Sequence, residues 1–178
     1  MKAIKKTVSV FCAALFLCVF SIDANASEVR VGGYSFSPFA ENVDGKLEGI
    51  TLEVIKEMNA LQDTYVFEFV PTSSKRRYRD FDNGDFDLIM FESIQWGWAD
   101  KPIEKSDVIY LGGEVYITRA VPGRDQDYFN DFKGIQILAS VGYHYGSADY
   151  DADEAFLERQ YNVKVNKSHE GNIQSVAD

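Results

Sequence analysis

The chain has 178 residues, enough for one domain or two small lobes, and 46% of them are hydrophobic, as in folded globular proteins. The 28 Asp and Glu residues outnumber the 18 Lys and Arg residues, and the net charge of −10 argues against a nucleic-acid partner. The only cysteines, Cys12 and Cys18, lie near the start of the chain, and His144 and His169 are far apart in it. We therefore expect no disulfide framework, no metal site and no cofactor.

The first 26 residues have the layout of a secretory signal peptide. Lys2, Lys5 and Lys6 precede an apolar run over Val8–Phe20, and small residues follow up to Ala26. The apolar run is too short to span the hydrocarbon core of a membrane, which is about 30 Å thick. We predict a signal peptide over 1–26, cleavage after Ala26, and export.

The next part of the chain, 27–119, alternates strand and helix patterns. In order, we predict a strand over 29–34, a helix over 51–61, a strand over 65–70, a helix from Ser73 or Ser74 to Gly84, and strands over 86–91 and 108–121. An Asp44-Gly45 turn follows the first strand. The run Phe86–Phe91 is nearly all apolar, which is typical of a central strand buried on both faces. The element order indicates an α/β fold with a parallel sheet covered by helices.

The remaining part, 120–178, restarts the pattern after Pro122-Gly123. The predicted elements are a strand over 135–141, a helix over 153–160 ended by Asn162, a strand over 163–165, and a helix over 172–177. Two clear strands are few for an independent core. We therefore expect 27–119 to form one lobe and 120–178 a second, incomplete lobe, in a chain that is truncated at its C-terminal end.

Ligands of open α/β sheets bind outside the carboxyl ends of the strands. That rule selects four loops as candidate binding segments. They are 34–39, 71–77, 92–98 and 142–146.

Several motifs occur in a characteristic order along the chain. They are Val29–Tyr34 with Ser37-Pro38-Phe39, Gly45–Ile50, Gly84 with Phe86–Ile89, and Phe132-Lys133-Gly134. This ordered set resembles bacterial periplasmic solute-binding proteins of the polar-amino-acid type, solute-binding protein family 3. The resemblance implies the two-lobed, type II (Venus-flytrap) binding-protein fold with mostly parallel sheets. It also implies a monomeric, non-enzymatic periplasmic protein that captures a small polar solute, an amino acid or related acid, between its lobes for an inner-membrane ABC permease.

One departure from that family concerns the carboxylate of the solute. Amino-acid binders of the family follow the central strand with Ser-Ile-Thr and then an arginine that grips the α-carboxylate. Here the stretch Glu92–Trp98 has no arginine, although Ser93 matches the family serine. Divergent members of that family often place an arginine near the start of the helix that ends at Gly84, and Arg76 is the best match by its distance from Gly84. The alternative is that Arg76 lies on a solvated helix face, paired with Asp80 and Asp82.

The other ligand-binding candidates are mostly aromatic. They are Tyr34, Phe36, Trp96, Trp98, Tyr143 and Tyr145, together with the carboxylate of Glu92. The tryptophans equally suit core or lobe packing, and one of Tyr34 and Phe36 is expected in the core. Glu92 meets a cationic group of the solute or lies exposed in its loop.

Two other functions remain open from the sequence. The first is an enzyme on the same fold, of the dehydratase or lyase type, for which only Glu92 and His144 offer an acid or a base. His144 fits a surface or hinge position better than a catalytic one. The second is a sensory binding domain without a transport role.

Overall fold

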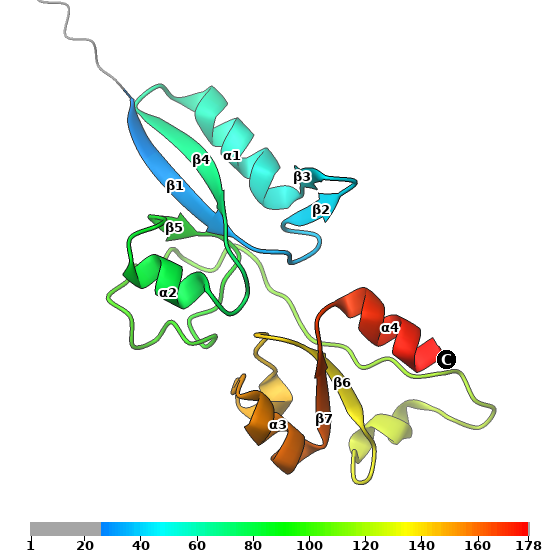
Figure 1. The fold of residues 1–178 in the computed structure, drawn as a ribbon. Coiled ribbons are helices and arrows are strands. Elements are labelled where there is room, and N and C mark those ends of the chain that lie inside the picture. Colours follow the sequence, from blue (N-terminus) through cyan, green and yellow to red (C-terminus); the bar gives the residue numbers. More distant parts are fainter. Residues whose placement is uncertain (1–25, 178) are drawn as a thin grey trace, which may run out of the picture.

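The computed structural model describes residues 26–177 as two α/β units joined by a long extended segment (Figure 1). The predicted signal peptide lies outside the described residues except for Ala26. The first unit contains β1 (Ser27–Gly33), β2 (Glu41–Val43), β3 (Lys46–Glu48), α1 (Ile50–Leu61), β4 (Tyr65–Pro71), α2 (Arg77–Asp82) and β5 (Leu88–Ile89). The second contains the 3₁₀ turns η1 (Gln126–Asn130) and η2 (Gly146–Ala148), with β6 (Ile137–Ser140), α3 (Glu154–Tyr161), β7 (Val163–Asn166) and α4 (His169–Ala177).

The sheet of the first unit is parallel, in the order β4-β1-β5, which confirms the predicted α/β class. β1 pairs with β4 along its whole length but with β5 only at Val31↔Leu88 and Gly32↔Ile89. The prediction that 86–91 forms the central strand is wrong, because β1 is central and β5 is a two-residue edge strand. The strand β5 is shorter than the apolar run at both ends. Before it, the ring of Phe86 packs over Gly32 of β1, and after it, Phe91 has a left-handed backbone (φ 59°) that does not continue a strand.

The helix α1 protects the outer edge of this sheet. Its Asn59 side chain accepts from the backbone N–H of Phe67 (2.8 Å) and donates to the carbonyl of Phe67 (2.9 Å) on the edge strand β4. Those bonds satisfy main-chain groups that an uncovered edge would expose.

The predicted helix 51–61 and the Asp44-Gly45 turn are confirmed, and the predicted second helix is the shorter α2. Ser73 helps to start α2, because its Oγ accepts from the N–H of Arg76 (3.2 Å).

The second unit is smaller. β6 and β7 form a parallel pair from Ile137↔Val163 to Ser140↔Asn166, over a core of Ala139, Ala148, Leu157 and Val163. The predicted helix 153–160 is confirmed as α3, and its predicted stop Asn162 adopts the left-handed conformation (φ 52°) that ends a helix. The last helix begins at His169, earlier than predicted.

The predicted strand 108–121 does not form. Residues 104–120, here called the connecting segment, make no backbone-to-backbone hydrogen bond with any residue of 26–177. Side chains fix the segment to the second unit instead: Arg119 donates to the carbonyls of Val176 (2.8 Å) and Ala177 (2.7 Å), and Tyr116 packs on Phe132. A strand needs a neighbouring strand to pair with, and the sequence pattern alone carries no information about whether one is present.

The two units touch at the carboxyl ends of their strands. The hydroxyl of Ser74 donates to the carbonyl of Val141 (2.9 Å), and the hydroxyl of Tyr143 donates to the carbonyl of Ser35 (2.9 Å). Gly142 is buried there, and the packing is close: a Cβ on it would lie 2.8 Å from Ser74 Oγ. Among residues 26–177, no helix has the length and apolar character needed to cross a membrane.

Candidate functional site

All four predicted binding loops meet at the contact between the units. One follows β1 and carries Tyr34 and Phe36, one follows β5 and carries Glu92, and one follows β6 and carries Tyr143. The fourth loop, which follows β4 and leads into α2, contributes Ser74. Loops at the carboxyl ends of parallel strands come together because all those strands run in one direction.

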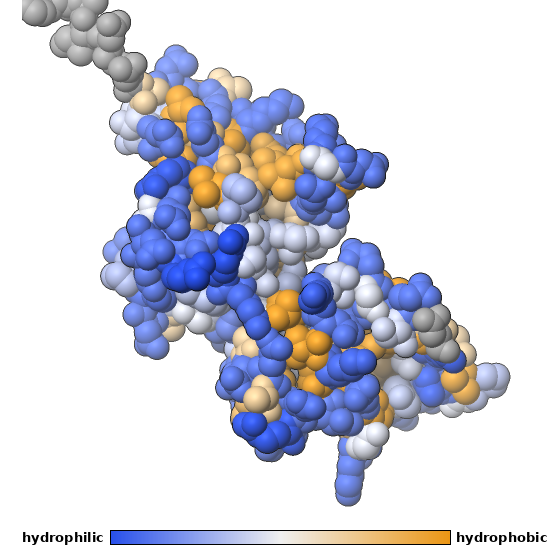
Figure 2. All heavy atoms as spheres, viewed as in Figure 1, coloured by the Kyte–Doolittle hydropathy of each residue, from blue (hydrophilic) through white to orange (hydrophobic). Residues whose placement is uncertain are grey.

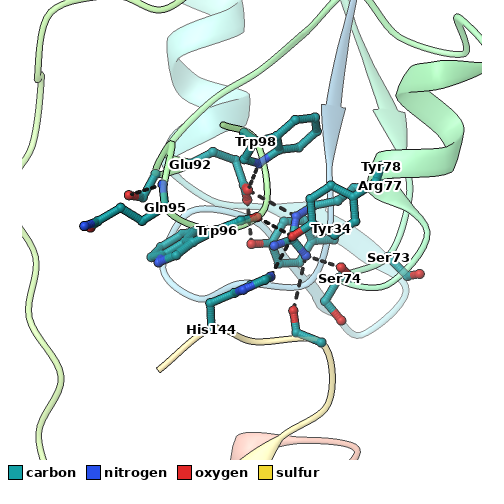
Figure 3. A network of polar contacts seen from close by, with 12 residues as sticks. Tyr34, Ser73, Ser74, Arg77, Tyr78, Glu92, Gln95, Trp96, Trp98 and His144 are labelled. Atoms are coloured by element: carbon teal, nitrogen blue, oxygen red, sulfur yellow. Dashed lines mark hydrogen bonds and ion pairs between the residues drawn. The ribbon is translucent and has the colours of Figure 1, made fainter. Parts of the chain in front are cut away.

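At the centre of this contact lies a buried ion pair between α2 and the β5 loop (Figure 3). Arg77 Nε is 3.1 Å from Glu92 Oε2, and only 1% and 7% of the two side chains are exposed. The guanidinium also donates to the carbonyl of Gly142 in the second unit (3.3 Å) and to that of Ser74. It lies 4.8 Å from the ring centroid of Tyr34 and 4.5 Å from that of Tyr78, at cation–π distance.

The carboxylate of Glu92 is fully engaged. Oε1 accepts from the hydroxyl of Tyr34 (2.6 Å), and Oε2 accepts from the indole N–H of Trp98 (2.5 Å) as well as from Arg77. Burial of the Tyr34 hydroxyl, together with the negative charge of Glu92, raises the pKa of Tyr34, so the hydroxyl stays protonated and donating. Glu92 therefore organises the packing of the first unit in this structure.

A second polar chain joins the units through His144. Its Nε2 is 2.7 Å from the hydroxyl of Tyr78, and its Nδ1 is 2.5 Å from the carbonyl of Tyr150. The carbonyl can only accept, so Nδ1 carries a proton. Burial, and then the positive charge of Arg77, lowers the pKa of His144, while burial raises the pKa of Tyr78 to about 12. With partners on both ring nitrogens, His144 ties the two units together.

Next to this polar network lies a group of aromatic rings from both units. The ring centroid of Phe36 is 5.8 Å from that of Tyr34, 5.9 Å from that of Trp96 and 5.5 Å from that of Tyr143. Phe36, Trp96 and Tyr143 are partly exposed. The faces of such rings carry negative potential, so they can contact an apolar group or a cation.

The structure thus brings together most of the predicted ligand-binding residues. Tyr34, Glu92 and Trp98 belong to the buried network, and Phe36, Trp96 and Tyr143 to the aromatic group. Ser93 lies beside them and caps a turn, since its Oγ accepts from the N–H of Gln95 (3.3 Å).

Two predicted residues lie elsewhere. Tyr145 packs against the core of the second unit, and its hydroxyl accepts from the N–H of Ser140 (2.7 Å). Arg76 immediately precedes α2 and its side chain is 54% exposed, with its Nε 3.9 Å from Asp80. It borders a separate hollow of about 520 Å³ that also includes Arg79, Asp80 and Asp85, so cationic and anionic side chains balance there.

Sequence reasoning missed Arg77, the arginine that the structure places at the centre. A usable signal was present around α2: Arg76 is four residues from the charged Asp80, with which it pairs, while Arg77 is four residues from the apolar Phe81 and shares its face. A count back from Gly84 could not separate two adjacent arginines.

Within 26–177, no cluster of three or more His, Cys, Asp or Glu side chains has an arrangement that could hold a metal ion.

Neither a protein-family model nor a curated protein sequence matches this chain. One solved structure to which it is similar is described as an ancestral cationic amino acid solute-binding protein, with 16% identity and a TM-score of 0.43. The alignment covers 85% of this chain and 65% of that structure, so the chain spans less than two thirds of the length of its structural neighbour.

Proposed function

We propose that this protein is an exported, two-lobed solute-binding protein that holds a small polar solute between residues 27–119 and 120–178. The observation that carries the proposal is the meeting of three strand-end loops, from two separate parallel sheets, around one group of aromatic rings. Strand-end loops of this kind are where α/β proteins bind ligands. The order of sequence motifs, which resembles solute-binding protein family 3, supports the same function.

The aromatic group is the proposed contact surface for the solute. Tyr34 and Phe36 come from one lobe and Tyr143 from the other, with Trp96 beside them, so a solute seated there touches both lobes. Arg77 and Glu92 neutralise each other below these rings and leave the walls uncharged. We expect a solute such as an amino acid, with its cationic or apolar part against the rings and polar groups near Ser93.

Entry of a solute requires the lobes to separate. The ties to be broken include hydrogen bonds of Tyr143 to Ser35, Tyr78 to His144, Ser74 to Val141 and Arg77 to Gly142. The ion pair of Lys75 with Glu154 and the ring contacts of Tyr143 with Tyr34 and Phe36 also cross the boundary. The connecting segment has no backbone pairing to resist such a movement. Hinge opening and closure of this kind is a common way for two-domain proteins to enclose a ligand.

The binding test is a thermal-shift titration of the chain from Ser27 onward against L-amino acids, polyamines, organic acids and small peptides. A bound solute should raise the Tm saturably without being consumed. Phe36→Ala should weaken binding at least tenfold, whereas Phe129→Ala, which removes a partly exposed ring of the second lobe, should not. If no compound shifts the Tm the proposal fails, and time-dependent loss of a compound indicates an enzyme instead.

Export and transport are separate parts of the proposal. Protein isolated from the periplasmic fraction should begin at Ser27 if the signal peptide is cleaved after Ala26. A periplasmic, monomeric receptor for an ABC permease should stimulate solute uptake by that permease in reconstituted vesicles. An intact Met1 in the isolated protein would contradict the export prediction.

A further inference from the structure

An apolar groove lies on the first unit, away from the contact between the units. It runs between α1 and the β2–β3 hairpin, has a volume of about 880 Å³, and is here called the α1 groove. Figure 2 shows hydrophobic side chains gathered in this region. Its apolar lining includes Leu47, Ile50, Leu52, Val54, Met58 and Leu61.

The groove exists because α1 has two apolar faces. One face, with Thr51 and Ile55, is buried against the sheet. The other bears Ile50, Val54 and Leu61, at positions i, i+4 and i+11, which fall on one stripe of a helix. Leu61 is 82% exposed and Ile50 is 43% exposed. Glu57, at i+7, interrupts this stripe, and Val54 is half-buried. Exposed apolar side chains gathered beside a hollow are nevertheless typical of an interaction surface.

The rim of the groove is acidic. Glu48, Glu53 and Glu57 line it together with a single cation, Lys46. Lys46 pairs with Glu48 (2.8 Å) and Lys56 pairs with Glu53 (3.2 Å), while Glu57 forms no ion pair with another residue of 26–177. Such a surface favours an apolar partner that carries basic residues.

We propose that the α1 groove docks an amphipathic helix of a partner protein, with its apolar face on the stripe and its Lys or Arg residues toward Glu57 and Glu53. The 12 residues of α1 make a groove about 18 Å long, which matches about three turns of a second helix. This docking does not depend on what binds between the lobes.

The experiment uses two fluorescent 14-residue helical peptides with leucines on one face, one with lysines and one with glutamates on the other. Fluorescence anisotropy with the chain from Ser27 onward measures the binding of each. We expect saturable binding of the leucine–lysine peptide, and at least tenfold weaker binding of the leucine–glutamate peptide. The binding of the leucine–lysine peptide should weaken as salt concentration rises.

Surface variants locate the binding. Leu61→Ser and Glu57→Lys should each weaken binding of the leucine–lysine peptide at least tenfold. The matched controls, Leu111→Ser and Glu158→Lys, change an equally exposed leucine and an exposed glutamate elsewhere and should have no effect. All four positions are exposed, so these variants should fold normally, which far-UV circular dichroism checks.

Three results would overturn the proposal. The first is equal binding of both peptides, or binding unaffected by Leu61→Ser. The second is a dimer in sedimentation velocity that Leu61→Ser abolishes, which would make a second copy of this chain the occupant. The third is Leu61-dependent binding to vesicles of anionic phospholipid, which would make a membrane surface the occupant.

Discussion

Arg77 and Glu92 form an ion pair that is almost completely withdrawn from solvent, on the boundary between the two units. Removing one partner of such a pair leaves the other charge buried and uncompensated. Glu92→Gln should therefore lower the free energy of unfolding by roughly 3–5 kcal/mol. Urea unfolding at neutral pH measures the effect.

The neighbouring Arg76 supplies the control for this prediction. Its side chain is exposed and its ion pair with Asp80 is long, so Arg76→Ala should change the free energy of unfolding by less than about 0.5 kcal/mol. Equal losses in the free energy of unfolding for Glu92→Gln and Arg76→Ala would contradict the argument that burial makes the loss of a partner in the Arg77–Glu92 pair more costly.

The fold was predictable where local signals act alone. The periodicity of 51–61, the Asp44-Gly45 turn and the stop at Asn162 depend on neighbours in the chain, and all three were predicted correctly. The short β5 and the unpaired connecting segment were not, because each depends on which strand lies beside it in space.

The candidate site shows the same division. The rule that loops at strand ends bind ligands selected the segments that meet between the units. It could not say which side chains would satisfy one another. Glu92 and Arg77 are both charged and both near the junction, yet the fold uses them as mutual partners, a pairing that spans 15 residues.

Gly142 sets how closely the units approach. Gly142→Ala should force them apart, because the added Cβ would lie 2.8 Å from Ser74 Oγ and 3.1 Å from the backbone nitrogen of Lys75. Gly134→Ala is the matched control: its φ is also positive (76° against 72°), but nothing lies within 4 Å of the added Cβ. Both variants bear the left-handed backbone cost of about 1–2 kcal/mol.

Only Gly142→Ala should increase the radius of gyration in small-angle X-ray scattering and speed amide hydrogen exchange around Ser74. An equal change in both variants would mean that the backbone conformation, and not the contact between the units, is responsible.

The connecting segment should be unprotected in hydrogen exchange. Its amides have no backbone acceptor among residues 26–177. Several of its apolar side chains are exposed, and Leu111 is the most exposed of them, at 87%. We expect these amides to exchange at the rate of an unstructured peptide, while those of β1 around the buried Val31 stay protected. Protection of 104–120 at high protein concentration would instead show that another strand pairs with the segment.

The link between Tyr78 and His144 should make stability depend on pH. Burial lowers the pKa of His144 in the folded protein below its ordinary value of 6.5, and the charge of Arg77 adds to this. The hydrogen bond to the Tyr150 carbonyl opposes the shift, as do the weaker effects of Glu92 and Asp151. Below pH 6.5 the unfolded chain therefore takes up the proton first, so the free energy of unfolding falls until the pH reaches the folded pKa. Above pH 6.5 the ring is neutral in both states and contributes no pH dependence.

His144→Gln should remove this contribution, and the difference in urea unfolding between the original protein and the variant should change between pH 7 and pH 5. The second histidine, His169, is present in both proteins and cancels in the comparison. A difference that stays constant over this range would mean that His144 is solvated in solution and that the two units are not held together through it.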